Sequence, residues 1–197
     1  MAQPAARPPS AAAVLSWRRA ETARLREIGA ALPLDDRRRR AKAAREHVAA
    51  AIPHLLGRTV ALYWPAAHEV SVLGLARTIL AAGGLTALPV DAADGRPFHF
   101  RAWTPGDPLA AGPSAPYPRD GPMVQPHVVL VGLAGFDGGN YRLCDEPARG
   151  ARLLAAAPEA YAVGVGLELM RLETVEPLAG ERPLDLVVTE AGAFPPG

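Results

Sequence analysis

The pattern of hydrophobic and polar positions predicts two helices at the start of the chain. Residues 11–31 carry apolar side chains at a spacing typical of a helix, and Ser10 precedes them as a suitable N-cap. A second helix is predicted to begin at Asp35 or Asp36, where an acidic side chain meets the positive end of the helix dipole, and to reach about Leu56. The apolar side of the first helix consists of Val14, Leu15, Leu25, Ile28 and Leu32.

Farther along the chain, short apolar runs alternate with helical patterns. This alternation is typical of a layered α/β domain with a mainly parallel sheet. We therefore predict an α/β fold, a three-layer α/β/α domain that the N-terminal helical pair precedes. The predicted strands lie at 59–64, 85–90, 97–103, 127–132, 161–167 and 184–189, and the predicted helices at 70–82 and 147–157.

Two segments fall outside this alternation. Residues 1–10 are rich in proline and alanine, and we expect them to form a disordered tail before a single domain at 11–197. Residues 104–126 are crowded with proline and glycine, which favours a long irregular loop. Loops of this length in compact domains are usually functional or mobile.

Composition and charge exclude several functional classes. With 197 residues, 49% of them hydrophobic, the chain has enough apolar material for one substantial core. Its formal net charge of +1 provides no overall field to attract nucleic acid or a membrane surface, and no apolar run is long enough to span a bilayer. Cys144 is the only cysteine, so an intrachain disulfide is impossible and a reducing cytoplasm is the expected setting.

Residues 136–152, FDGGNYRLCDEPARGAR, form the most informative segment. Their first half resembles the opening of FDxxGxRLGYGGGYYDR, the nucleotide-binding signature of the 5-formyltetrahydrofolate cyclo-ligase (methenyltetrahydrofolate synthetase) family. The run PLDLVVTE at 183–190 resembles a second motif of that family. The chain as a whole resembles a divergent member of the family. The segments that resemble the family, in its own order, lie at 23–71, 83–103, 112–118, 128–143 and 162–190.

The resemblance implies a reaction in folate one-carbon metabolism. Members of the family use ATP and Mg²⁺ to convert 5-formyltetrahydrofolate into 5,10-methenyltetrahydrofolate, with transfer of a phosphoryl group to the formyl oxygen. The expected partner is therefore a small molecule, a reduced folate, with no nucleic acid or membrane.

Three residues are candidates for binding folate. Glu69 matches the glutamate that contacts folate in the family, and a carboxylate can accept hydrogen bonds from pterin N–H groups. Tyr63 and Trp103 have flat side chains that can stack on a pterin or aminobenzoyl ring. The alternative is structural: Glu69 then stands near the start of the following helix, and the two aromatic residues belong to the core.

Five further residues are candidates for phosphate and metal. Arg142 and Arg152 match arginines of the signature, and Arg19 stands near the position of a family lysine, as does its neighbour Arg18. Glu181 falls on the acidic position of a family His-Asp pair and is the candidate magnesium ligand. The alternatives are ordinary surface ion pairs for the arginines and a solvated carboxylate for Glu181.

The second half of the signature segment departs from the family. A phosphate cradle relies on glycines, whose backbone N–H groups converge on the phosphates. Here Asp145 and Glu146 bring negative charge, and Pro147 lacks an N–H. The family's metal-binding aspartate is replaced by Ala151. These changes argue against ATP-dependent activity, although ATP and Mg²⁺ are the cofactors that the resemblance implies.

Two alternative functions remain open at this point. In the first, the protein binds a folate or another flat ligand and catalyses nothing. In the second, it is a repurposed enzyme in which Asp137, Asp145 and Glu146 form a new acidic site, because carboxylates clustered at the end of a strand can bind a metal or act as acid and base.

Overall fold

The computed structural model describes residues 10–52, 57–91, 97–143 and 147–197. Nearly all of the tail predicted at 1–10 lies outside these residues, and so do Cys144, Asp145 and Glu146. The helices of the described part are α1 (Ala11–Ala31), α2 (Leu34–Ala51), α3 (Leu75–Ala81) and α4 (Pro147–Ala155), with a 3₁₀ turn, η1 (Glu168–Met170).

One mainly parallel sheet runs through the middle of the structure. Its strands are β1 (Thr59–Ala61), β2 (Leu85–Val90), β3 (His99–Ala102), β6 (Met123–Val124), β7 (Val128–Gly132), β10 (Tyr161–Val165), β11 (Leu186–Thr189) and β12 (Gly192–Phe194). They are ordered β12-β11-β10-β7-β1-β2-β3-β6. The five central strands pair in parallel, and antiparallel pairs occur only toward the two edges of this sheet in the described residues.

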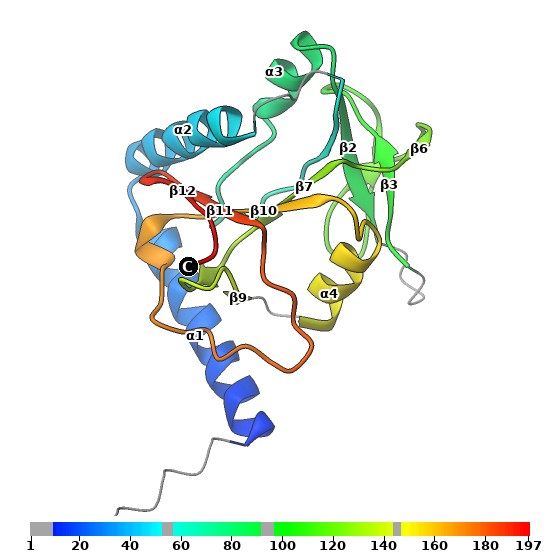
Figure 1. Ribbon diagram of the computed structural model, residues 1–197. Helices are drawn as coiled ribbons and strands as arrows, with labels where there is room; N and C mark the ends of the chain where they lie inside the picture. Colours follow the sequence, from blue (N-terminus) through cyan, green and yellow to red (C-terminus); the bar gives the residue numbers. More distant parts are fainter. Residues whose placement is uncertain (1–9, 53–56, 92–96, 144–146) are drawn as a thin grey trace, which may run out of the picture.

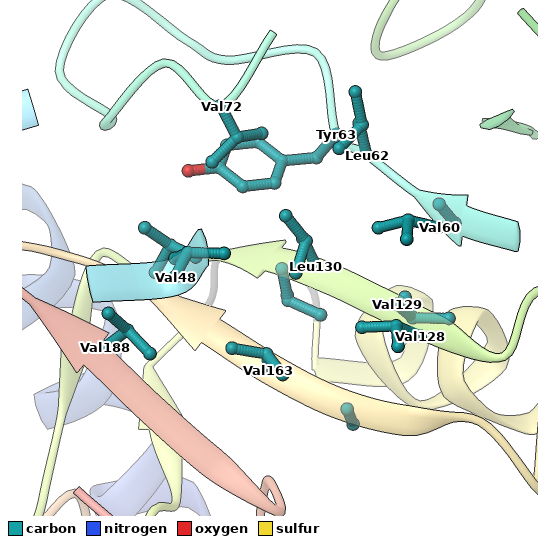
Figure 2. Close-up of a cluster of buried hydrophobic side chains, with 14 of the residues drawn as sticks. Val48, Val60, Leu62, Tyr63, Val72, Val128, Val129, Leu130, Val163 and Val188 are labelled. Atoms are coloured by element: carbon teal, nitrogen blue, oxygen red, sulfur yellow. The ribbon is translucent and has the colours of Figure 1, made fainter. Parts of the chain in front are cut away.

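Helices cover both faces of the sheet. Figure 1 shows α2 and α3 on one side and α1 and α4 on the other. The central strands β7, β10 and β11 are almost continuously apolar and buried, as expected for parallel strands that helices cover on both faces. In Figure 2, Val48 of α2 lies over Leu130, Val163 and Val188 of these strands. The predicted α/β class, the mainly parallel sheet and the N-terminal helical pair are confirmed.

The segment predicted as an irregular loop, 104–126, contains short strands instead. β4 (Leu109–Ala110) pairs with β5 (Tyr117–Pro118), and β6 extends the edge of the central sheet. A second small hairpin joins β8 (Gly135–Phe136) to β9 (Arg142–Leu143). Strands of two residues have no detectable alternation of their own, and only their pairing defines them.

Several predicted boundaries were wrong by a few residues. The second helix begins at Leu34 with Pro33 as N-cap, without a side-chain cap from Asp35 or Asp36, and it ends at Ala51. The strand predicted at 59–64 is limited to β1, and the helix predicted at 70–82 begins only at Leu75. The strand β12 was not predicted, because its three residues include a glycine that weakens any strand pattern.

The buried side of α1 differs from the predicted one. The bounds of this helix and its cap are confirmed, since the Ser10 hydroxyl accepts a hydrogen bond from Ala13 N at 3.3 Å. Of the predicted apolar side, only Leu25 is fully buried, and Ile28 is 37% exposed. The buried residues of α1 are Arg18, Thr22, Leu25 and Gly29, which follow the i, i+4, i+7, i+11 spacing of one helix face.

Candidate functional site

The β8–β9 hairpin, which carries the FD motif, is organised around one buried carboxylate. Asp137 Oδ1 accepts hydrogen bonds from Gly139 N at 3.0 Å and Tyr141 N at 3.1 Å. Its Oδ2 accepts a third from Val175 N at 3.0 Å, so the hairpin is tied to the loop that follows η1. Both oxygens are bonded and the residue is 5% exposed. Asp137 therefore has a structural role here, which counts against its place in a new acidic site.

Asn140 maintains the turn at the signature's glycine position. Its φ is 59°, in the left-handed region that asparagine adopts more readily than most residues. Its side-chain Nδ2 donates to Phe194 O at 3.1 Å, which attaches the segment after β11 to the hairpin. The hairpin thus keeps the backbone shape that a glycine would give it.

Arg18 is a buried cation with a dedicated partner, Glu181. Its Nη1 and Nη2 donate to the two oxygens of Glu181 at 2.9 Å each, in a bidentate pair. The same nitrogens also donate to the backbone oxygens of Glu176 and Arg142 at 3.0 Å. Arg18 is 2% exposed, so the guanidinium exchanges water for these four acceptors.

Glu181 sits at the end of a tight turn. Glu181 N donates to Leu178 O at 3.0 Å, and Gly180 has φ of 84°, as the third residue of a type II turn requires. Leu178 N donates back to Glu181 Oε2 at 3.1 Å. Both carboxylate oxygens are therefore committed to Arg18, and one of them also to the turn.

A cleft of about 370 Å³ opens beside this ion pair. One wall comes from α4 and the residues after it, and is apolar. The other comes from the β8–β9 hairpin and the turn at Gly180, and includes charged side chains. The lining residues are Tyr141, Arg142, Ala151, Leu154, Ala155, Pro158, Gly180, Glu181 and Arg182.

The structure brings only some of the predicted phosphate and metal residues together. Arg142 and Glu181 both line the cleft. Arg19 lies on the exposed side of α1, and the neighbouring Arg18 is the buried one. Arg152 is instead beside Asp91, with an N–O distance of 3.8 Å, and over the ring of Phe98. A signal for Arg18 was available, since it shares the helical spacing of Thr22, Leu25 and Gly29, but an apolar pattern does not include arginine.

Two of the residues assigned to folate, Glu69 and Tyr63, lie near one another at the carboxyl end of the parallel strands, whereas the backbone of Trp103 is hydrogen-bonded to Thr86, near the amino end of β2. An added Cβ at Gly132, the last residue of β7, would be 2.8 Å from Glu69 Oε1 and 2.9 Å from Tyr63 Cε2. Ligands of open α/β sheets bind outside this end of the strands. Glu69 and Tyr63 therefore occupy a suitable position, and only glycine leaves room for both at Gly132.

Each of these residues also has a structural contact. Glu69 Oε2 accepts from Ala66 N at 2.8 Å and closes its own turn; it does not cap a helix, because α3 begins six residues later. The buried Tyr63 hydroxyl donates to Val70 O. Burial, and secondarily the charge of Glu69, raises the pKa of Tyr63 well above its usual value, so the phenol stays protonated.

Trp103 is a core residue with one unused polar group. It is 6% exposed and meets Trp64 edge to face, with ring centroids 6.4 Å apart at 77°. Its indole Nε1 is buried and has no hydrogen-bond partner among the described residues.

The described residues do not fit a magnesium site in the cleft. None of their His, Cys, Asp and Glu side chains form a group of three that could hold a metal ion. Glu181 is neutralised by Arg18, and Ala151, at the position of the family's aspartate, has no ligand atom. The predicted role of Glu181 as a magnesium ligand would require the Arg18 pair to break.

A second polar network joins α2 to the carboxyl ends of β10 and β11. Thr189 Oγ1 donates to Glu168 Oε2 at 2.9 Å, and Glu168 N donates to Glu190 Oε2 at 2.9 Å. Arg171 also donates to the Glu168 carboxylate, and Arg40 to that of Glu190. The hydrogen bond from Arg171, helped by that from Thr189 and opposed by burial, holds the pKa of Glu168 below its usual value.

This shift predicts an acid-dependent contribution of Glu168 to stability. Because the folded-state pKa is below the unfolded one, the contribution is complete above the unfolded pKa, about 4.3, and is lost as pH falls through the folded pKa. The urea midpoint of Glu168→Gln should therefore be lower than that of the wild type near neutral pH, and the difference should shrink below about pH 4. A difference that is independent of pH would contradict this assignment.

Comparison with known proteins places the fold. The chain is similar to the NMR structure of Aquifex aeolicus 5,10-methenyltetrahydrofolate synthetase, with a TM-score of 0.78 and 22% identity over 90% of this chain and 92% of that one. It is also similar to the 5,10-methenyltetrahydrofolate synthetase of Mycoplasma pneumoniae, with a TM-score of 0.70 and 16% identity over 88% and 98% of the two chains. The chain therefore has the fold of these synthetases, as the signature segment indicated.

Sequence comparisons alone do not detect this similarity. No family model matches the chain, and no curated protein matches it. In the part of the chain that the structure describes, no helix combines the length and the apolar character needed to cross a membrane.

Proposed function

We propose that this protein is a divergent member of the 5-formyltetrahydrofolate cyclo-ligase family that binds a reduced folate in the cytoplasm and has lost the family's ATP-dependent reaction. The folate part of the proposal rests on the fold and on Glu69, which lies against Tyr63 and Gly132 at the carboxyl end of β7. A carboxylate there can accept hydrogen bonds from pterin N–H groups.

The lost reaction rests on one observation, the ion pair between Arg18 and Glu181. It engages the carboxylate that would hold magnesium and one of the cations that could hold phosphate, because each is bonded to the other. The sequence of the loop adds a proline and two acids where glycines are needed. ATP and Mg²⁺ are therefore not cofactors of the function that we propose.

Titration of tryptophan fluorescence with 5-formyltetrahydrofolate, without ATP, tests the folate site. We expect saturable quenching, because Trp64 follows Tyr63 directly in the segment that leads to Glu69 and is only partly buried. Glu69→Ala should weaken binding about tenfold or more, since a hydrogen bond to a charged group contributes roughly 1.5–3 kcal/mol. Gly132→Ala should also weaken it, because the new methyl group displaces Glu69 or Tyr63.

The matched control is Glu27→Ala, which removes an exposed glutamate from α1 and should leave the affinity unchanged. Equal affinities for Glu69→Ala and Glu27→Ala would reject the folate site. Absence of any quenching in the wild type would reject the proposed ligand.

A further inference from the structure

The carboxylate of Glu181 is bound in the way that proteins bind an external anion. It receives two parallel N–H bonds from a guanidinium and a third from the backbone N–H of Leu178. The guanidinium of Arg18 is held in place from behind, since two carbonyls, those of Glu176 and Arg142, accept its remaining Nη hydrogens. Removal of the Glu181 side chain would therefore leave an oriented, buried cation.

This arrangement lies directly under the surface of the cleft. Glu181 lines the cleft and its side chain is 19% exposed, whereas Arg18 beneath it is 2% exposed. Gly180, next in the chain, has open space around the position of an added Cβ. Glu181 is thus the side chain that separates Arg18 from the cleft on this side.

We propose that Arg18 is an anion receptor in the wall of the cleft, and that Glu181 occupies it as an internal ligand. The pair has no net charge, and a divalent cation that approached Glu181 would meet the guanidinium immediately behind it. The occupied receptor therefore excludes a metal–polyphosphate complex from the cleft. Once Glu181 is removed, the receptor accepts a small anion of the carboxylate or phosphate class without a metal.

The proposal concerns the cleft and does not depend on folate binding near Glu69. Its test uses Glu181→Ala and inorganic phosphate as the probe, with thermal unfolding followed at constant ionic strength, which sodium chloride maintains. The variant should melt roughly 10 °C below the wild type, because it leaves a buried charge without its partner. Phosphate should then raise its midpoint with the logarithm of its concentration above the apparent Kd, by about 5 °C at roughly fifty times that Kd.

Two proteins provide the controls. The wild type should show no such rise with phosphate, since its receptor is filled. The double variant Arg18→Met with Glu181→Ala should show none either, because the receptor is gone. Equal stabilisation of all three proteins by phosphate, or no effect on Glu181→Ala, would overturn the proposal.

The receptor can still be tested if the Glu181→Ala variant fails to fold. If Glu181→Ala is insoluble, its refolding yield with and without phosphate gives the same distinction. A yield that rises saturably with phosphate supports the receptor, and one that does not overturns it.

Calorimetry of the wild type is a second measurement. ATP binding that Mg²⁺ strengthens tenfold or more would also overturn the proposal, because it would require Glu181 to leave Arg18.

Discussion

Replacement of Arg18 by alanine is expected to destabilise the protein by about 3–5 kcal/mol, because it leaves Glu181 partly buried and without a counter-charge. The same change removes the donors to Glu176 O and Arg142 O, which join α1 to the β8–β9 hairpin and to the loop that follows η1. Arg19→Ala, one residue away on the exposed side of α1, should change stability by about 0.5 kcal/mol or less. Urea unfolding, followed by circular dichroism, measures both.

A second variant separates the charge from the packing. Arg18→Met together with Glu181→Leu replaces the pair with apolar side chains of similar size, which is often neutral for stability. It should therefore recover most of the loss seen in Arg18→Ala. If Arg18→Ala and Arg19→Ala unfold at the same urea concentration, the buried ion pair is not what holds α1 in place.

Asp137→Ala is expected to cost at least about 3 kcal/mol, since three backbone N–H groups lose their acceptor and each unsatisfied group costs about 1–3 kcal/mol. Asp137→Asn keeps one acceptor oxygen and should cost less. The matched control is Asp120→Ala, an exposed aspartate whose loss should be close to neutral.

The comparison also tests the alternative of a new acidic site. In that alternative, Asp137→Asn would abolish an activity and leave the urea midpoint unchanged. The structural role of Asp137 is supported if Asp137→Ala is the least stable protein, Asp137→Asn is intermediate and the wild type is the most stable. An Asp137→Ala protein as stable as Asp120→Ala would contradict it.

The central sheet could be predicted because its signal is local. β2, β7, β10 and β11 are short, nearly continuous apolar runs between turn residues, and parallel strands buried on both faces have this sequence pattern. The bounds of α1 were also local, with Ser10 at one end and Pro33 beyond the other. By contrast, β12 and the two-residue strands between 104 and 126 are too short to show an alternation of their own, and only their pairing with other strands defines them.

The site was less predictable because its key contact joins residues far apart in the chain. Glu181 was a candidate from its position in a motif, but its partner is on α1 and no spacing rule connects the two. The same holds for Arg152, whose match to an arginine of the signature suggested that it binds phosphate. In the structure it and Arg149 pack against Asp91 and Phe98. The sequence made Asp137 a candidate for an acidic site. The three backbone N–H groups that donate to its carboxylate are visible only in the structure.

The most direct test of this account is to incubate the purified protein with 5-formyltetrahydrofolate, Mg²⁺ and ATP, and to follow the ultraviolet absorbance of the methenyl product. We predict no product that depends on ATP, together with saturable quenching of tryptophan fluorescence by the same folate. Formation of 5,10-methenyltetrahydrofolate that requires ATP would contradict the account, because the cleft would then have to bind metal and phosphate despite the pair between Arg18 and Glu181.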